Sequence, residues 1–278
     1  MKQFYRKANT EEINFYEKEI YPLQDRIFEI ASLYDDKIYL TGGTALSRFY
    51  FNHRLSEDLD FFTLTDDLKL IAGDFIGRLT KKGFIIDIEK LEIYFARFFI
   101  REKNYILKIE FVREYNLFSS LIKTEKGIYI NNLEDIGGNK ITAFEDRAEI
   151  KDIIDLYFIT EKIPLQRLFE IADLKRALVP YENLLTINTT GLSGKGLIIN
   201  DIDEEKLVDF LNKLKENTEK EIKKKEKEAL TGIDEIIYKT LWDFPPEDRK
   251  IDKNSIPVIR RRLKDLAFPH RIILEKML

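Results

Sequence analysis

Two aspartates two residues apart, Asp58 and Asp60, are the side chains of this sequence best placed to do chemistry. On a strand this spacing puts both carboxylates on one face, while Leu59 and Phe61 point the other way, into the core. Two carboxylates about 4 Å apart repel by roughly 4 kcal/mol at an effective dielectric constant of about 20. A cation between them removes that repulsion, and oxygen-only ligands favour Mg²⁺ or Mn²⁺. The pair therefore predicts a divalent metal site, although many surface strands and turns also contain an Asp-x-Asp.

A glycine pair shortly before the aspartates strengthens this interpretation. Gly42 and Gly43 lie between an apolar segment at 38–40, which we expect to be a strand, and a short helix expected over Thr44–Phe51. Glycine lets the backbone approach a phosphate closely, and a helix N-terminus presents free N–H groups. The Thr44 hydroxyl can add one hydrogen bond. A tight turn capped by Thr44 is the structural alternative, but a cradle followed so closely by an Asp-x-Asp indicates a triphosphate site beside a metal site.

A third carboxylate is expected from the strand-like segment 106–112. Its apolar side chains alternate with Lys108 and Glu110, which lie on the opposite face. If that face is shared with the two aspartates, Glu110 completes a three-carboxylate site for two metal ions, one of which would activate an attacking hydroxyl. A solvent-facing Glu110 is the alternative, and Asp87 is a weaker competitor for the same role.

Cationic side chains follow in the second half of the chain. On an uninterrupted helix Lys140, Arg147 and Lys151 would share one face and could hold phosphates. A helix break near Glu149 would undo this alignment. Two acids, Asp152 and Asp155, come next, and a salt-bridge network or a helix start is their structural explanation.

The pattern of the whole chain predicts an α+β protein with a mixed β-sheet core and flanking helices, followed by a mainly helical C-terminal half. We place the boundary between residues 1–130 and 131–278. Strands are expected at 58–62, 84–88, 93–101 and 105–112, the last three as a meander. Helices are expected at 10–33, 66–82, 132–147, 151–160, 165–178, 203–230 and 256–266, with a loop at 188–195.

Composition narrows the functional classes. The chain has 278 residues, 44% of them hydrophobic, and no cysteine, which excludes disulfides and thiolate metal sites. The start lacks the apolar run of a signal peptide, and no stretch approaches the 18 apolar residues of a membrane span, so we expect a cytoplasmic protein without a membrane partner. The net charge of −4 does not indicate a nucleic-acid binder, but six basic residues against two acidic ones between Val258 and Leu278 form a local excess.

Taken together, these motifs resemble the AbiEii/AbiGii-type nucleotidyltransferases, toxins of the DNA-polymerase-β-like superfamily. The resemblance covers roughly residues 35–160. Two strings carry it: Gly42-Gly43-Thr44-Ala45-Leu46 with His53-Arg54-x-Ser56-x-Asp58-Leu59-Asp60-Phe61-Phe62, and Lys140 with Arg147, Lys151-Asp152 and Asp155-Leu156-Tyr157. The glycine motif has Gly-Thr where Gly-Ser is usual in the superfamily, and this keeps the hydroxyl.

The resemblance implies a role for each matched position. Gly43 and Thr44 would bind the triphosphate, with Gly42 beside them, and the paired aspartates would hold Mg²⁺. Lys140, together with Arg147, would contact the nucleotide phosphates. Asp152 would be the catalytic acid of the last motif, with Asp155 as its alternative. His53 and Arg54 match the family string without an evident catalytic step, and they could simply hold the loop before the aspartates.

The resemblance also implies a toxin of a toxin–antitoxin or abortive-infection system that moves a nucleotide from an NTP to an acceptor hydroxyl. The expected acceptor is a tRNA 3′ end, and the basic segment Arg260–Lys264 would suit tRNA phosphates. Protein nucleotidylation and a catalytically silent nucleotide- or RNA-binding module are the alternatives. A cognate antitoxin protein encoded nearby is the expected partner.

Overall fold

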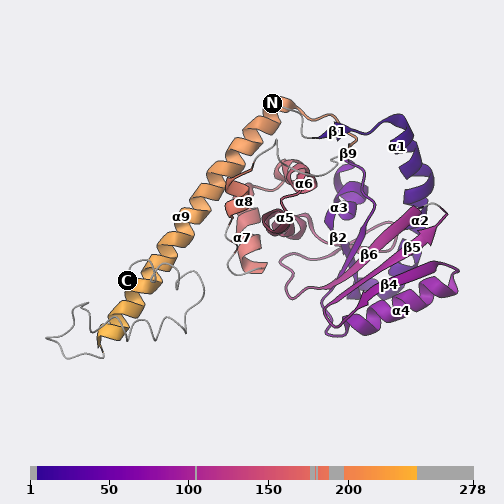
Figure 1. Cartoon of the computed structure of the whole chain (residues 1–278), viewed down its shortest axis with the longest axis horizontal. Helices are drawn as coiled ribbons and strands as arrows, with labels where there is room; N and C mark the ends of the chain where they lie inside the picture. The colour runs from indigo at the N-terminus through magenta and orange to yellow at the C-terminus, as the bar shows by residue number, and fades with distance from the viewer. Residues whose placement is uncertain (1–4, 104, 176–178, 180, 188–196, 243–278) are drawn as a thin grey trace. The chain divides into compact units, whose positions relative to one another are not determined.

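The computed structural model describes residues 5–242, apart from 104, 176–178, 180 and 188–196; side chains are described up to residue 225 (Figure 1). Contacts group the chain into two compact units, residues 1–214 and 215–278. The expected boundary after residue 130 stays a prediction. The expected loop at 188–195 and helix at 256–266 lie outside the described residues. In the described part, no helix has the length and apolar character needed to cross a bilayer.

A mixed seven-stranded sheet forms the centre of the first unit, in the strand order β4-β5-β6-β3-β2-β8-β7. The strands are β2 (Tyr39–Thr41), β3 (Leu59–Thr63), β4 (Ile85–Leu91), β5 (Phe95–Glu102), β6 (Tyr105–Arg113), β7 (Ile122–Lys123) and β8 (Tyr129–Ile130). The predicted meander is confirmed, because β4, β5 and β6 pair antiparallel in sequence. β3 then pairs parallel with β6 and antiparallel with β2, which makes the sheet mixed.

The two faces of this sheet differ in polarity. On one face, the rings of Phe61, Phe75, Phe98 and Phe111 pack against one another and are fully buried. Phe75 comes from α4 (Leu68–Lys81), which lies along β4–β6 on this side (Figure 1). Because side chains alternate along a strand, burying one set of residues leaves the intervening polar set on the opposite face.

Helices precede the first strand of this sheet, and a further helical segment follows β2. α1 (Thr10–Phe15), the π-helix η1 (Tyr16–Ile20), α2 (Tyr21–Ala31) and the 3₁₀ helix η2 (Ser32–Lys37) precede the sheet. The helix expected from Thr44 begins two residues earlier, as α3 (Gly42–Ala45) followed by the π-helix η3 (Leu46–Phe51). Gly42 has φ +69°, a conformation that favours glycine, and so turns the chain directly from β2 into the helix.

The remaining described elements are mainly helical, as predicted. They are α5 (Leu133–Arg147), α6 (Ile150–Thr160), α7 (Leu165–Lys175), α8 (Glu182–Leu185) and α9 (Glu204–Trp242), together with a short parallel pair of β1 (Arg6–Lys7) and β9 (Leu197–Ile198). The break expected near Glu149 is present: Ala148 takes a left-handed conformation (φ 48°) and ends α5. α6 therefore starts in a new direction, and its acids do not continue the face of α5.

α5 and α7 pack closely at two glycines. A Cβ at Gly138 would lie 2.6 Å from Cγ2 of Ile171, and one at Gly137 would lie 2.5 Å from Cδ2 of Leu168. A side chain at either position would force these helices apart, so the glycines set their separation.

We predict that Gly138→Ala lowers the free energy of unfolding by about 1–2 kcal/mol, because overpacking costs more than the gain in helix propensity. Gly77→Ala is the matched control, since a Cβ at Gly77 in α4 meets nothing within 4 Å. That change should stabilise by up to about 1 kcal/mol. Urea unfolding of both variants measures the difference, and equal effects would contradict the packing argument.

Candidate active site

A pocket of about 610 Å³ opens over the polar face of the sheet. Its lining comes from η1, α3, the loop at 54–58, the strands β3, β6 and β9, α5 and the start of α6. The lining residues are Tyr16, Gly43, Arg54, Leu55, Ser56, Glu57, Asp58, Asp60, Lys108, Glu110, Lys140, Arg147, Glu149, Ile150, Lys151 and Leu197. The predicted carboxylates and most of the predicted cations are thus brought together around one cavity. Gly42, Thr44 and Asp152 support it without lining it.

The strand register explains why the carboxylates meet. Asp60 of β3 is paired with Glu110 of β6, and Leu59 with Ile109, so both acids lie on the same face in neighbouring strands. Asp58 directly precedes β3, where the same register continues toward Lys108. Asp87 lies two strands further from β3, opposite Phe99, and its carboxylate pairs with Arg101. The sheet therefore favours Glu110 over Asp87 as the third carboxylate.

Two cations already contact these carboxylates. Nζ of Lys108 lies 3.1 Å from Oδ2 of Asp58 and 3.3 Å from Oε2 of Glu110. Nε of Arg97, on β5, donates to Oε1 of Glu110 at 2.5 Å. Although burial opposes it, the charges of Lys108 and Arg97 keep the pKa of Glu110 below its ordinary value. Glu110 is therefore ionised and held in place by both neighbours.

Asp60 is in a different situation. Burial, and then the charges of Glu110 and Asp58, raise its pKa to about 6 from an ordinary 3.8. Its carboxylate lies against the backbone of Gly42, where a Cβ would come within 2.6 Å of Oδ2. This carboxylate faces more negative charge than its nearby cations offset, so a bound cation would stabilise its ionised form.

These features bear on the predicted Mg²⁺ or Mn²⁺ site. The donors are carboxylate oxygens, and Asp60 carries uncompensated charge, which fits a hard divalent cation. In the described residues, however, no three acidic or histidine side chains are arranged tightly enough to hold a metal ion. This agrees with the contacts of Glu110, whose carboxylate pairs with Lys108 and Arg97. Asp58 and Asp60 remain the residues that fit the metal best.

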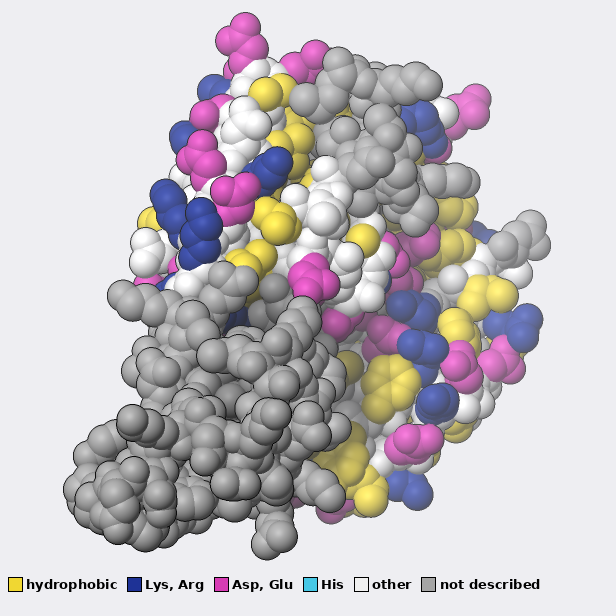
Figure 2. Space-filling model, turned by 60° about the vertical axis from the view of Figure 1, so that its left-hand side comes forward, with side chains coloured by type: hydrophobic (Ala, Val, Ile, Leu, Met, Phe, Trp, Pro, Cys, Tyr) yellow, Lys and Arg dark blue, Asp and Glu magenta, His cyan; other side chains and the backbone are white. Residues whose placement is uncertain are grey.

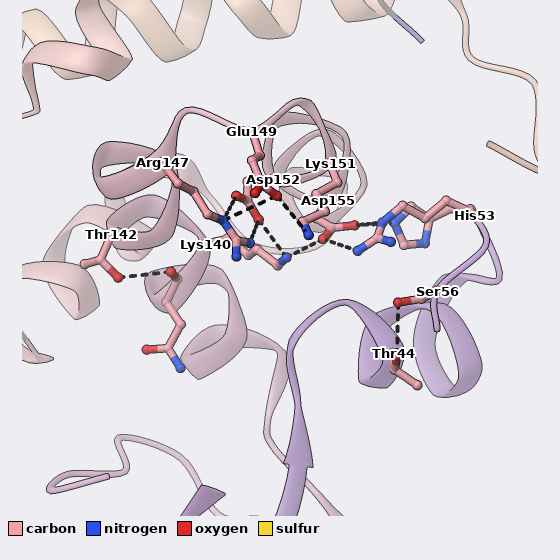
Figure 3. Close-up of polar contacts among 12 residues, drawn as sticks. Thr44, His53, Ser56, Lys140, Thr142, Arg147, Glu149, Lys151, Asp152 and Asp155 are labelled. Atoms are coloured by element: carbon pink, nitrogen blue, oxygen red, sulfur yellow. Dashed lines mark hydrogen bonds and ion pairs between the residues drawn. The ribbon is translucent and has the colours of Figure 1, made fainter. Parts of the chain in front are cut away.

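Hydrogen bonds hold the loop that carries Asp58. The Thr44 hydroxyl donates to the carbonyl of Asp58. It also lies 2.9 Å from the hydroxyl of Ser56, and Figure 3 draws this second contact. Gln24 of α2 donates to the carbonyls of Ser56 and Glu57 at 3.1 and 2.9 Å. Thr44 is buried. The Thr44 hydroxyl therefore holds the loop that carries Asp58, whereas the sequence predicted that it would bind a phosphate.

The carboxylate of Asp155 connects this loop to α6. Arg54 donates to both of its oxygens, through Nε at 2.7 Å and Nη2 at 2.9 Å, and Nε2 of His53 lies 2.7 Å from Oδ1. Nζ of Lys140 is 2.6 Å from Oδ2. Asp155 and His53 are fully buried, and Arg54 nearly so. The role left open for His53 and Arg54 is therefore positional: they hold the loop before the aspartates.

Asp152 makes a second set of ion pairs. Arg147 donates to both of its oxygens at 2.8 Å, and Nζ of Lys140 donates to Oδ1 at 2.8 Å. Figure 3 shows the resulting chain of contacts from Arg147 to His53. Lys151 joins it only through Glu149, which pairs with Lys151 at 2.8 Å and with Arg147 at 3.6 Å. The single cationic face expected of an uninterrupted helix is therefore wrong, since α5 ends at Arg147.

The charges of this network are fixed by their neighbours. Burial alone would raise the pKa of Asp155, but the charges of Arg54 and Lys140 hold it well below its ordinary value. Burial likewise opposes the charge on Lys140, yet Asp152 and Asp155 raise its pKa. Burial lowers the pKa of His53, so the neutral ring donates through Nε2 to Asp155. The network thus carries two negative and three positive charges and presents a cationic wall to the pocket.

The comparisons with known proteins agree with this arrangement. The family model of the AbiEii nucleotidyl transferase toxins of type IV toxin–antitoxin systems matches residues 26–243. The chain belongs to this family. No curated protein matches it in sequence. The chain is therefore a nucleotidyltransferase of a toxin family, and the predicted family and α+β fold are confirmed.

Two solved structures illustrate what this chain is similar to. MenT4, a nucleotidyltransferase toxin from Mycobacterium tuberculosis, has a TM-score of 0.52 at 15% identity, over 89% of this chain and 92% of that chain. JHP933 from Helicobacter pylori has a TM-score of 0.48 at 20% identity, over 82% of this chain and 99% of that chain. The MenT4 likeness supports the nucleotidyltransferase fold of this AbiEii family member, at an identity too low to assign residues.

Sequence reasoning missed two members of the site. Lys108 was seen only as a same-face neighbour of Glu110, and Arg97 was not considered. The alternation of β5 and β6 is the signal that could have found them, because it places Arg97 and Lys108 on the polar face. The register that brings them beside the acids depends on the turn between these strands.

We predict that Asp155→Asn lowers the free energy of unfolding by about 3–5 kcal/mol at pH 7, because it leaves Arg54 and Lys140 without their buried counter-charge. Asp209→Asn serves as the control. It removes an exposed partner of Lys213 on α9 and should change stability by less than about 0.5 kcal/mol. Denaturant unfolding monitored by circular dichroism tests both, and a loss below 1 kcal/mol for Asp155→Asn would refute the dependence on this carboxylate.

Asp60 should behave in the opposite way in metal-free protein. Its raised pKa means that the ionised form destabilises the fold above about pH 6, and this cost fades as the pH falls toward 3.8. Asp60→Asn should therefore stabilise by about 1–2 kcal/mol at pH 7.5 in EDTA and by less at pH 5. Thermal melts across this range measure the gain. A gain that grows toward low pH would contradict the assignment.

Proposed function

We propose that this chain is a Mg²⁺-dependent nucleotidyltransferase that transfers a nucleotide from an NTP to the 3′ end of a tRNA. The observation that carries the proposal is the division of the pocket into two walls. One wall has Asp60 of β3 and Asp58 directly before it, whereas the other has Lys140 and Arg147 of α5 and Arg54 of the loop that precedes β3. A metal–triphosphate complex has the matching charges, positive at the metal and negative along the phosphates.

Each wall would hold one part of the substrate. Asp58 and Asp60 would hold Mg²⁺ or Mn²⁺, which when bound would neutralise charge on the α-phosphate and lower the pKa of the acceptor hydroxyl. Arg147 is the more accessible phosphate ligand, with 42% of its side chain exposed against 6% for Lys140. Lys140 would act mainly by keeping Asp152 and Asp155 in place while lending positive charge to the wall.

The reaction needs little covalent participation from the protein. The acceptor oxygen would form a bond to the α-phosphorus as the α–β phosphate bond breaks, releasing pyrophosphate and the hydroxyl proton. Positioning and charge neutralisation supply the rate enhancement in such transfers. The free N–H groups at the start of α3, beside Gly43, suit the triphosphate, as expected for a helix N-terminus.

The acceptor is the least constrained part of the proposal. On the face shown in Figure 2, the described Lys, Arg, Asp and Glu side chains are interspersed. The basic segment Arg260–Lys264, which we expect to contact tRNA phosphates, lies outside the described residues. Family membership supports a cognate antitoxin as a further partner, and neutralisation by the product of a neighbouring gene would fit it.

Label transfer from α-³²P-NTPs with Mg²⁺ and total tRNA tests the proposal. We expect label at tRNA 3′ ends with the wild type, and at least about 100-fold less with Asp60→Asn, because a metal-holding carboxylate is lost. Asp209→Asn should match the wild type.

The same label-transfer experiment, together with a binding measurement, distinguishes the two alternative functions, protein nucleotidylation and a catalytically silent binding module. Label on protein instead of RNA would indicate protein nucleotidylation. Nucleotide binding by calorimetry without transfer to either acceptor, with wild type and Asp60→Asn alike, would indicate a silent binding module and overturn the proposal.

A further inference from the structure

Lys108 occupies the space between two of the site carboxylates. Its Nζ is 3.1 Å from Oδ2 of Asp58 and 3.3 Å from Oε2 of Glu110, so the ammonium bridges them. It also lines the pocket, and 30% of the side chain is exposed. A cation that bridges carboxylates from adjacent strands stands where a metal ion of a three-carboxylate site would be expected.

The backbone fixes this placement. Leu107, Ile109 and Phe111 are fully buried on the apolar face of β6, so Lys108 and Glu110 must point to the pocket face. The parallel register with β3 then sets Asp60 beside Glu110 and brings Asp58 alongside Lys108. Removing Lys108 from the carboxylates would require a different side-chain conformation, not a different strand position.

The net charge of the site favours fewer bound metal ions than three unpaired carboxylates would. Asp58, Asp60 and Glu110 carry three negative charges when ionised. Lys108 and Arg97 contact these acids directly, but Arg97 also pairs with Glu89 at 3.1 Å, so the set keeps between one and two net negative charges. Three free carboxylates suit two divalent ions, whereas this set has enough remaining charge for only one.

We propose that the Lys108 ammonium permanently fills one of the two cation positions of the carboxylate site, so that the chain binds one divalent ion where three free carboxylates would bind two. The inference rests on the proposed function in taking Asp58 and Asp60 as metal ligands. It differs from the two-metal site expected from the sequence, and it gives Glu110 the role of holding Lys108 instead of a metal.

Counting bound Mn²⁺ tests this directly. The free ion is measured by electron paramagnetic resonance during titration of the protein, alone and with saturating α,β-methylene-ATP. We expect one ion per wild-type chain with the nucleotide analogue and two per chain for Lys108→Met. Without nucleotide, Lys108→Met should still bind one ion more than the wild type, so the test stands even if the analogue does not bind.

Two further variants make the count specific. Lys151→Met removes the same charge from the same pocket, but its ammonium pairs with Glu149, so its ion count should equal that of the wild type. Adding Glu110→Gln to Lys108→Met should remove the gained ion, which places that ion between Asp58 and Glu110. Melting temperatures confirm that each variant is folded.

Two wild-type ions in the presence of nucleotide would show that Lys108 moves aside, and this would overturn the proposal, as would equal counts for wild type and Lys108→Met. These outcomes are independent of label transfer. A chain that transfers nucleotides with two ions would refute only this inference, whereas the expected counts without any transfer would refute only the proposed function.

Discussion

Asp155 accepts contacts from His53, Arg54 and Lys140, groups that come from two separate parts of the chain. Taking a carboxylate out of water costs several kcal/mol unless its partners satisfy it in good geometry. Arg54 does so with two parallel hydrogen bonds, which also fix the direction of the loop leading to Asp58. The position of Asp58 and Asp60 relative to the cationic wall therefore depends on one buried ion pair between the loop and α6.

The glycines of the cradle are explained by the same contact. A Cβ at Gly43 would fall 2.0 Å from Nη2 of Arg54, so the guanidinium packs directly on the glycine backbone. Gly42 in turn leaves room for the carboxylate of Asp60 and takes the positive φ that joins β2 to α3. The sequence suggested that both glycines make room for phosphate. In the structure they first make room for Arg54 and Asp60, the charged groups that would surround it.

The sequence predicts the parts of this structure that depend on interactions between near neighbours in the chain. It does not predict the contacts between residues that are far apart in the chain. Alternation and helical periodicity depend on near neighbours, and they predicted the strands β2 to β6, the meander and the break near Glu149, but not the two-residue strands β1, β7, β8 and β9. The pairing of Asp60 with Glu110 followed from alternation and an assumed shared face. Contacts such as Arg54 with Asp155, 101 residues apart, depend on how α6 turns after Ala148, and no local pattern encodes this direction. For that reason the sequence did not show that Lys151 reaches the pocket from α6, nor that Lys140 pairs with Asp152 and Asp155.

The two walls of the pocket also explain why the site tolerates so much buried charge. The network around Asp152 and Asp155 has an excess of positive charge, and the set around Asp60 has an excess of negative charge. The charges of each wall reduce the free-energy cost of burying the opposite charges of the other wall. Lys140, for example, lowers the pKa of Asp60, which would otherwise rise further. The unfavourable electrostatic interaction that remains acts on Asp60, whose ionised carboxylate a metal ion would stabilise most. Such a site is least stable without its substrate. Binding of the substrate's charges would relieve the repulsion at Asp60 and so stabilise the folded chain.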